Sequence, residues 1–146
     1  MSIKREKPRC RSCQRRILPF TFLGAALIGA GEHAGARQTL LKVLPWAQKD
    51  HVGFLAIGLY YFAELLVLES QVADLPGPLE RGALAMTLLS CVRSQSATWR
   101  IFKDKAAQLQ AEIEESLPAE LCATALARGK SCTLAEMVNA VVKAVD

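Results

Sequence analysis

Cysteine is the residue type with the clearest chemical potential in this 146-residue chain, and it occurs five times. Cys10 and Cys13 have the Cys-x2-Cys spacing of half a zinc site, but no second pair and no His-x3-His follows. Because a closed zinc site needs four ligands, we expect no metal here. The other three, Cys91, Cys122 and Cys132, lie in or beside apolar helical segments. This setting favours free thiols in a reducing cytoplasm over a disulfide framework.

No set of residues typical of catalysis accompanies these thiols. The only histidines, His33 and His51, have no obvious catalytic partner and are expected at a solvated turn and a helix start. The adjacent acids Glu114 and Glu115 fall near the end of an expected helix, which indicates a solvated face. A phosphate-binding Gly-x4-Gly-Lys-Ser/Thr loop, a Gly-x-Ser-x-Gly elbow and a His-Glu-x2-His motif are all missing from the sequence. We therefore predict a non-enzymatic protein that needs no cofactor.

The composition is that of one helical domain preceded by a basic tail. Hydrophobic residues make up 51% of the chain and aromatic residues 6%, with alanine and leucine dominant, which favours closely packed helices over sheets. Residues 1–16 contain seven basic residues and one acidic residue, so they account for all of the net charge of +4, and they have no apolar periodicity. We predict a flexible tail over 1–16 and a single domain over 17–146. The tail supports at most weak, nonspecific, salt-sensitive contact with nucleic acid.

Apolar periodicity, glycine and proline breaks and capping residues predict about seven helices and no sheet. The sixth is expected to start at Pro118 and end at Gly129, and the seventh to start at a Thr133-x2-Glu136 capping box. Trp99 is expected to anchor the core. The expected helices cover approximately residues 20–31, 33–48, 51–69, 78–93, 98–115, 118–129 and 133–145.

Residues 20–40 form the stretch around which the other helices are expected to pack. Its spacing, Phe-x2-Leu-Gly-x2-Leu…Ala-x3-Leu, predicts two helices separated at Gly31, with the small residues Gly24 and Ala36 in contact where they cross. This spacing resembles the tetratricopeptide repeat, with phenylalanine in place of the leading tryptophan and Gln48 at the closing proline position. The resemblance implies antiparallel hairpins stacked in a right-handed solenoid. Any helical hairpin with small residues at its contact remains an alternative.

The C-terminal segment ALARGKSCTLAEMVNAVV resembles the end of the helical-repeat domain in bacterial predicted-ATPase and LuxR-type transcriptional regulators. Their closing segment has the form Ala-x3-Gly-x2-Leu-Thr-Leu-x-Glu-Ala, from which this chain departs at Cys132 and Met137. The resemblance implies a sensor or scaffold domain that works without its own nucleotide site. The matching positions are Ala125, Gly129, Thr133, Leu134 and Glu136.

We therefore predict a cytoplasmic scaffold domain that binds a protein or peptide in a concave groove. In tetratricopeptide domains the first helix of each hairpin lines that groove. The alternative is a membrane-associated or exported helical protein that uses residues 17–31 as an anchor or signal segment, since a basic stretch precedes this apolar run. The candidate groove residues are Thr21, Ala25, Ile28, Gly53 and Tyr60.

Overall fold

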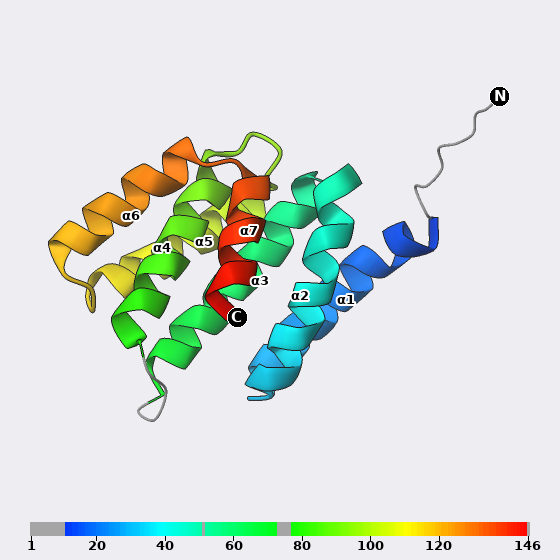
Figure 1. Ribbon diagram of the computed structural model, residues 1–146, viewed down its shortest axis with the longest axis horizontal. Helices are drawn as coiled ribbons and strands as arrows, with labels where there is room; N and C mark the ends of the chain where they lie inside the picture. The colour runs from blue at the N-terminus through cyan, green and yellow to red at the C-terminus, as the bar shows by residue number, and fades with distance from the viewer. Residues whose placement is uncertain (1–10, 51, 73–76, 146) are drawn as a thin grey trace.

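The computed structural model describes residues 11–50, 52–72 and 77–145, and within these ranges every regular element is a helix. Figure 1 shows the helices packed into one body, with α1 and α2 at one side and α6 at the other. The prediction of an all-helical protein is confirmed for the described residues, which form seven helices. The helices are α1 (Arg11–Gly29), α2 (His33–Asp50), α3 (Val52–Ser70), α4 (Pro78–Ser94), α5 (Arg100–Glu114), α6 (Ala119–Ser131) and α7 (Leu134–Val145).

The helix ends follow local chemistry at most of the predicted places. Gly31 separates α1 from α2 with a φ of 81°, a left-handed conformation that glycine adopts without strain. Before α7, the Thr133 backbone N–H donates to Glu136 Oε1 over 2.8 Å, and the Glu136 N–H donates to Thr133 Oγ1 over 3.1 Å. The predicted capping box is therefore confirmed. Helix α1 begins at Arg11, inside the segment predicted as tail, and Pro19 lies within it.

Gly129 does not end α6, contrary to the sequence-based prediction, because the helix continues to Ser131. A Cβ atom at Gly129 would lie 2.4 Å from the Thr87 carbonyl oxygen and 2.5 Å from Ser90 Cβ. Such distances are far below van der Waals contact, so the side chain is absent to let α6 pack directly on the α4 backbone. The glycine serves helix packing at this position and not helix termination.

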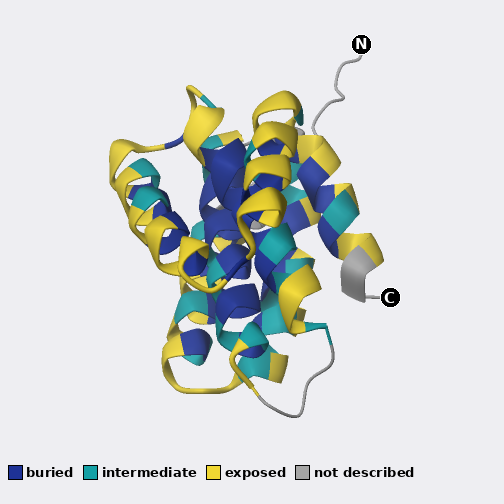
Figure 2. Ribbon diagram, turned by 90° about the vertical axis from the view of Figure 1, so that its left-hand side faces the viewer, coloured by how far each residue is buried: buried dark blue, intermediate teal, exposed yellow. Residues whose placement is uncertain are grey.

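The core is centred on α3 and α4. Most α3 residues from Leu55 to Glu69 are buried, and α4 is buried from Ala85 to Val92. Figure 2 shows the buried residues gathered on the inner helices and the exposed ones on the outer turns. A helix that is apolar nearly all round needs neighbours on several sides, and α3 has them in α1, α2, α4, α5 and α7.

Helix α2 lies between α1 and α3 and packs against a glycine on each. A Cβ atom at Gly24 of α1 would lie 2.8 Å from Leu40 Cδ2, and one at Gly58 of α3 would lie 3.0 Å from Leu44 Cδ2. Gly24 is therefore a close-approach site as predicted, but its nearest neighbour across the hairpin is Leu40. Ala36 is fully buried one turn earlier on α2.

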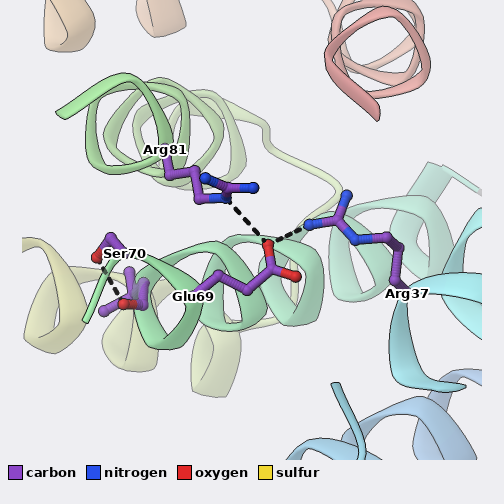
Figure 3. A network of polar contacts seen from close by, with 5 residues as sticks. Arg37, Glu69, Ser70 and Arg81 are labelled. Carbon is purple, nitrogen blue, oxygen red and sulfur yellow. Dashed lines mark hydrogen bonds and ion pairs between the residues drawn. The ribbon is translucent and has the colours of Figure 1, made fainter. Parts of the chain in front are cut away.

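A buried carboxylate joins three helices of this core. Glu69 of α3 is 6% exposed and accepts a hydrogen bond and ion pair from Arg37 of α2. The Arg81 Nε atom of α4 lies 3.5 Å from the same carboxylate oxygen (Figure 3). The Arg37 guanidinium also lies 5.4 Å from the centre of the Phe62 ring. This cluster neutralises a charge whose burial would otherwise be costly.

Among the described residues, α3 is the one helix long and apolar enough to span a bilayer by length and composition. Its apolar stretch is 67% buried inside the fold, and a core helix meets the same criteria. The apolar part of α1, Arg16–Gly29, is shorter.

Candidate partner-binding groove

Helices α1, α3 and α5 present a row of aromatic side chains on one face of the molecule. Phe22 lies 6.1 Å from Tyr61 between ring centres, Tyr61 lies 5.8 Å from Phe102, and Phe102 lies 6.4 Å from Trp99. Phe54 ends the row, 6.2 Å from Trp99. We call these five residues the aromatic row. Phe22 is 44% exposed and Trp99 46%, so the row offers large apolar surface to solvent.

A hollow of about 690 Å³ lies on the same three helices, nearer their C-terminal ends. Tyr60 connects the two features, because its side chain lines the hollow and its ring centre lies 5.2 Å from Tyr61 and 5.6 Å from Phe102. The volume is in the range of sites that hold a small molecule or several side chains. The apolar part of the lining consists of Ala25 and Ile28 from α1, Val67 and Leu68 from α3, and Leu109 from α5.

The shared positions along these helices show that α1, α3 and α5 run in the same direction. Phe22, Tyr61 and Phe102 meet in the aromatic row, whereas Gly29 at the end of α1, Gln71 just after α3 and Glu112 near the end of α5 meet in the hollow. The face therefore has an aromatic end and a polar end. We call the hollow and the aromatic row together the α1–α3–α5 groove.

Two carboxylates and one lysine face the polar end. The Tyr60 hydroxyl donates to Glu64 Oε2 over 3.2 Å, and Glu112 and Lys105 of α5 line the same hollow. Burial raises the pKa of Glu64, with a further increase from Glu112 and opposing effects of the Tyr60 hydrogen bond and Lys105. Burial and then the charge of Glu64 also raise the pKa of Tyr60. The tyrosine therefore stays protonated at neutral pH and acts here as a hydrogen-bond donor.

The structure places the five predicted groove residues in three different settings. Ala25, Ile28 and Tyr60 line the hollow together. A Cβ atom at Gly53 would lie 3.4 Å from Trp99 Nε1, which puts this glycine beside the aromatic row. Thr21 is fully buried, and its hydroxyl donates to the Ile17 carbonyl oxygen over 2.6 Å. Its side chain is therefore engaged inside α1. A binding role for these residues stays a prediction.

Sequence reasoning missed Trp99 and Phe22 as surface residues. Trp99 was predicted in the core, but it is nearly half exposed and directly precedes α5. Its exposure comes from that position, because α5 begins at Arg100 and the core-facing aromatic of its first turn is Phe102, which is 4% exposed. The signal in the sequence was two aromatic pairs, Tyr60 and Tyr61 in the middle of the expected helix 51–69 and Trp99 and Phe102 in the first turns of the expected helix 98–115.

The other candidate chemical groups do not converge in the described part of the chain. No group of three or more histidine, cysteine or acidic side chains lies close enough to hold a metal ion there. Cys10 and His51, and the side chain of Cys13, fall outside the described residues. Cys91 and Cys122 are buried free thiols, and Cys91 Sγ donates to the Cys132 carbonyl oxygen over 3.3 Å.

No protein-family model, curated protein or solved structure matches this chain. The function of this protein is therefore inferred from the geometry of the groove.

Proposed function

We propose that this protein is a non-enzymatic cytoplasmic scaffold domain that binds a segment of a partner protein in the α1–α3–α5 groove. The observation that carries the proposal is the aromatic row, whose exposed Phe22 and Trp99 continue into the hollow through Tyr60. Exposed aromatic side chains beside a concave surface are typical of protein-binding sites. No catalytic group is needed for this role.

The stacking of the helices supports a tetratricopeptide-like solenoid as the basis of this groove. Helices α1 and α3 take the place of the first helices of two hairpins, and α2 and α4 that of the second helices. In the first two hairpins the paired helices are in contact, α1 with α2 and α3 with α4. The third pair departs from the pattern, because α6 packs mainly against α4 and not against α5. The groove then corresponds to the concave face that such repeats use for ligands. A relationship to the sensor part of a bacterial transcriptional regulator is part of the same proposal.

The test is a pull-down from host lysate with the full chain, Ala25→Arg and Ala26→Arg. Ala25 lines the hollow, whereas Ala26 is exposed on the next position of α1 and is absent from the lining, so the second variant controls for the added charge. We expect a partner retained by the full chain and by Ala26→Arg and lost with Ala25→Arg. Equal retention by both variants would contradict binding in the groove.

A fourth protein in the same experiment lacks residues 1–10, the part of the predicted basic tail that precedes α1. It tests whether this part of the tail contributes to binding. We expect the partner to be retained at physiological and at several-fold higher salt, because screening weakens only the charge contribution of the tail. Loss of every partner on this deletion would move the function to residues 1–10. Weak binding of polyanions by the tail should fade as salt rises.

Export or membrane association through residues 17–31 is the second candidate, favoured by the exposed side chains of Phe20, Phe22 and Leu23 on α1. Against it, α1 contributes Ile17 and Ile28 to the core and holds Gly24 against Leu40. We expect protein isolated from its host to retain α1 when its mass is measured. A species that starts near Arg37 would establish the signal-segment alternative.

A further inference from the structure

We propose that the segment bound in the α1–α3–α5 groove is an amphipathic helix that carries a lysine or arginine, and that this cation pairs with Glu64 and Glu112 in the hollow. The inference rests on the proposed function and adds the chemistry of the partner. It follows from the different surroundings of two carboxylates on α3, those of Glu64 and Glu69.

Glu69 and Glu64 lie five positions apart on α3 but have opposite electrostatic surroundings. Glu69 is paired with Arg37 from α2 and Arg81 from α4. Within the described ranges, Glu64 has no ion pair, and its one hydrogen bond comes from the neutral Tyr60 hydroxyl. A partly buried carboxylate that has no ion pair loses hydration, and at Glu64 the nearby charge of Lys105 offsets this only in part, because burial has the larger effect and raises its pKa. A cation supplied by a partner would compensate for the lost hydration of Glu64.

The charges that face the hollow give it a negative balance. Glu64 and Glu112 contribute two carboxylates, and Lys105 is the only basic residue among the lining side chains. Gly29 and Gln71 place the C-terminal ends of α1 and α3 at the same end, where the helix dipole also favours a cation. Lys105 is exposed and its charge acts on Glu64, but it forms no ion pair there, so the two carboxylates still outnumber the one cation in the lining.

The apolar surroundings define the rest of the partner segment. Ala25, Ile28 and Leu109 offer an apolar wall to the stem of a lysine or arginine and to a neighbouring aliphatic side chain. The aromatic row continues this surface toward the N-terminal halves of α1, α3 and α5, where Phe22 and Trp99 are exposed. A helix of about 14 residues, roughly 21 Å long, would reach from the hollow to the row. Apolar side chains three and four positions apart would then contact the groove, as in other helix-in-groove complexes.

The test uses two synthetic probe peptides of about four helical turns, one with a leucine face and lysine on the polar face, the other with glutamate in place of lysine. Fluorescence anisotropy measures the binding of each to the full chain, Glu64→Gln, Glu114→Gln, Ala25→Arg and Ala26→Arg. Glu114 is exposed on α5 and is absent from the lining, so its variant removes the same charge outside the hollow. Thermal unfolding confirms that each variant is folded.

We expect the lysine peptide to bind at least tenfold more tightly than the glutamate peptide. Glu64→Gln should weaken binding of the lysine peptide about fivefold or more and Glu114→Gln less than twofold, because Glu64 is partly shielded from solvent whereas Glu114 is exposed. Ala25→Arg should abolish binding and Ala26→Arg should not.

The outcomes separate this inference from the proposed function. Equal or tighter binding of the glutamate peptide, lost with Ala25→Arg, would overturn the basic partner and leave the groove in place. If Ala25→Arg and Ala26→Arg change the binding equally, both the basic partner and the groove as the binding surface are refuted. The same holds if neither peptide binds. Equal weakening by Glu64→Gln and Glu114→Gln would reduce the effect to general surface charge and would also refute the pairing.

Discussion

Replacing Gly129 with alanine tests the close contact between α6 and α4. The added Cβ atom would lie 2.4 Å from the Thr87 carbonyl oxygen and 2.5 Å from Ser90 Cβ, so α4 and α6 must move apart. The obstacle is backbone, which cannot rotate away as a flexible side-chain end can. The same shift would disturb the hydrogen bond from the Ser90 hydroxyl to the Leu126 carbonyl oxygen, which is 2.7 Å long.

The expected cost is the sum of three terms. Overpacking a rigid contact costs about 1–3 kcal/mol, and a weakened hydrogen bond adds about 0.5–1.5 kcal/mol. Alanine raises the free energy of unfolding by about 1 kcal/mol, because it is a better helix former than glycine. Gly129→Ala should therefore lower the free energy of unfolding by about 2 kcal/mol, which is about 6 °C in Tm for a chain of this length.

Gly29→Ala is the matched control, because Gly29 is also helical and a Cβ atom there would meet no atom within 4 Å. It should leave the stability unchanged or raise it by up to about 1 kcal/mol. Urea unfolding followed by circular dichroism measures both variants against the parent protein. If Gly129→Ala proves as stable as the parent, or if the two variants behave alike, the direct packing of α6 on the α4 backbone is wrong.

Three further predictions test the electrostatics and the thiols. Burial raises the pKa of Glu64, so its ionisation opposes folding above the unfolded pKa of about 4.3, and Glu64→Gln should be more stable than the parent at neutral pH but not below that value. Unfolding curves that show the same gain at acid and neutral pH would contradict this. Glu69→Gln removes the buried carboxylate that Arg37 and Arg81 share and should cost about 3 kcal/mol, whereas Asp104→Asn removes an exposed pair and should change stability by under about 0.5 kcal/mol. Similar losses in the two variants, measured by thermal unfolding, would disprove the role of the buried cluster. Burial raises the pKa of the Cys91 thiol to about 11, so a maleimide should modify the half-buried Cys132 well before Cys91, and mass spectrometry would show the reverse order if this account is incorrect.

The helical class was predictable because its determinants are local. Gly31 and the Thr133–Glu136 capping box act on the residues next to them, and both behave as the sequence indicates. The positions of Gly129 and Trp99 were not predictable in the same way. A glycine near the end of a helix has the same local pattern whether it stops the helix or admits a neighbour, and only the α4 backbone across the contact decides between them.

The candidate groove was partly predictable for the same physical reason. Assigning α1 and α3 to an inner layer was enough to select Ala25, Ile28 and Tyr60, which do line one hollow. Thr21 has a similar position along α1, yet its hydroxyl turns back to the helix backbone. The hydrogen bond between Tyr60 and Glu64 is a local contact within α3, whereas the aromatic row that includes Trp99 depends on how α5 and the residue before it dock against α3. Periodicity within one helix carries no information about that docking.

Photo-crosslinking in the host tests the central claim most directly. A benzoylphenylalanine placed at Phe22 keeps an aromatic side chain in the aromatic row, and the same residue at Leu121, which is 37% exposed on α6, is the control outside the groove. The account predicts a discrete crosslinked partner from position 22 and none from position 121. A partner captured equally at both positions, or only at position 121, would show that the α1–α3–α5 groove is not the binding surface.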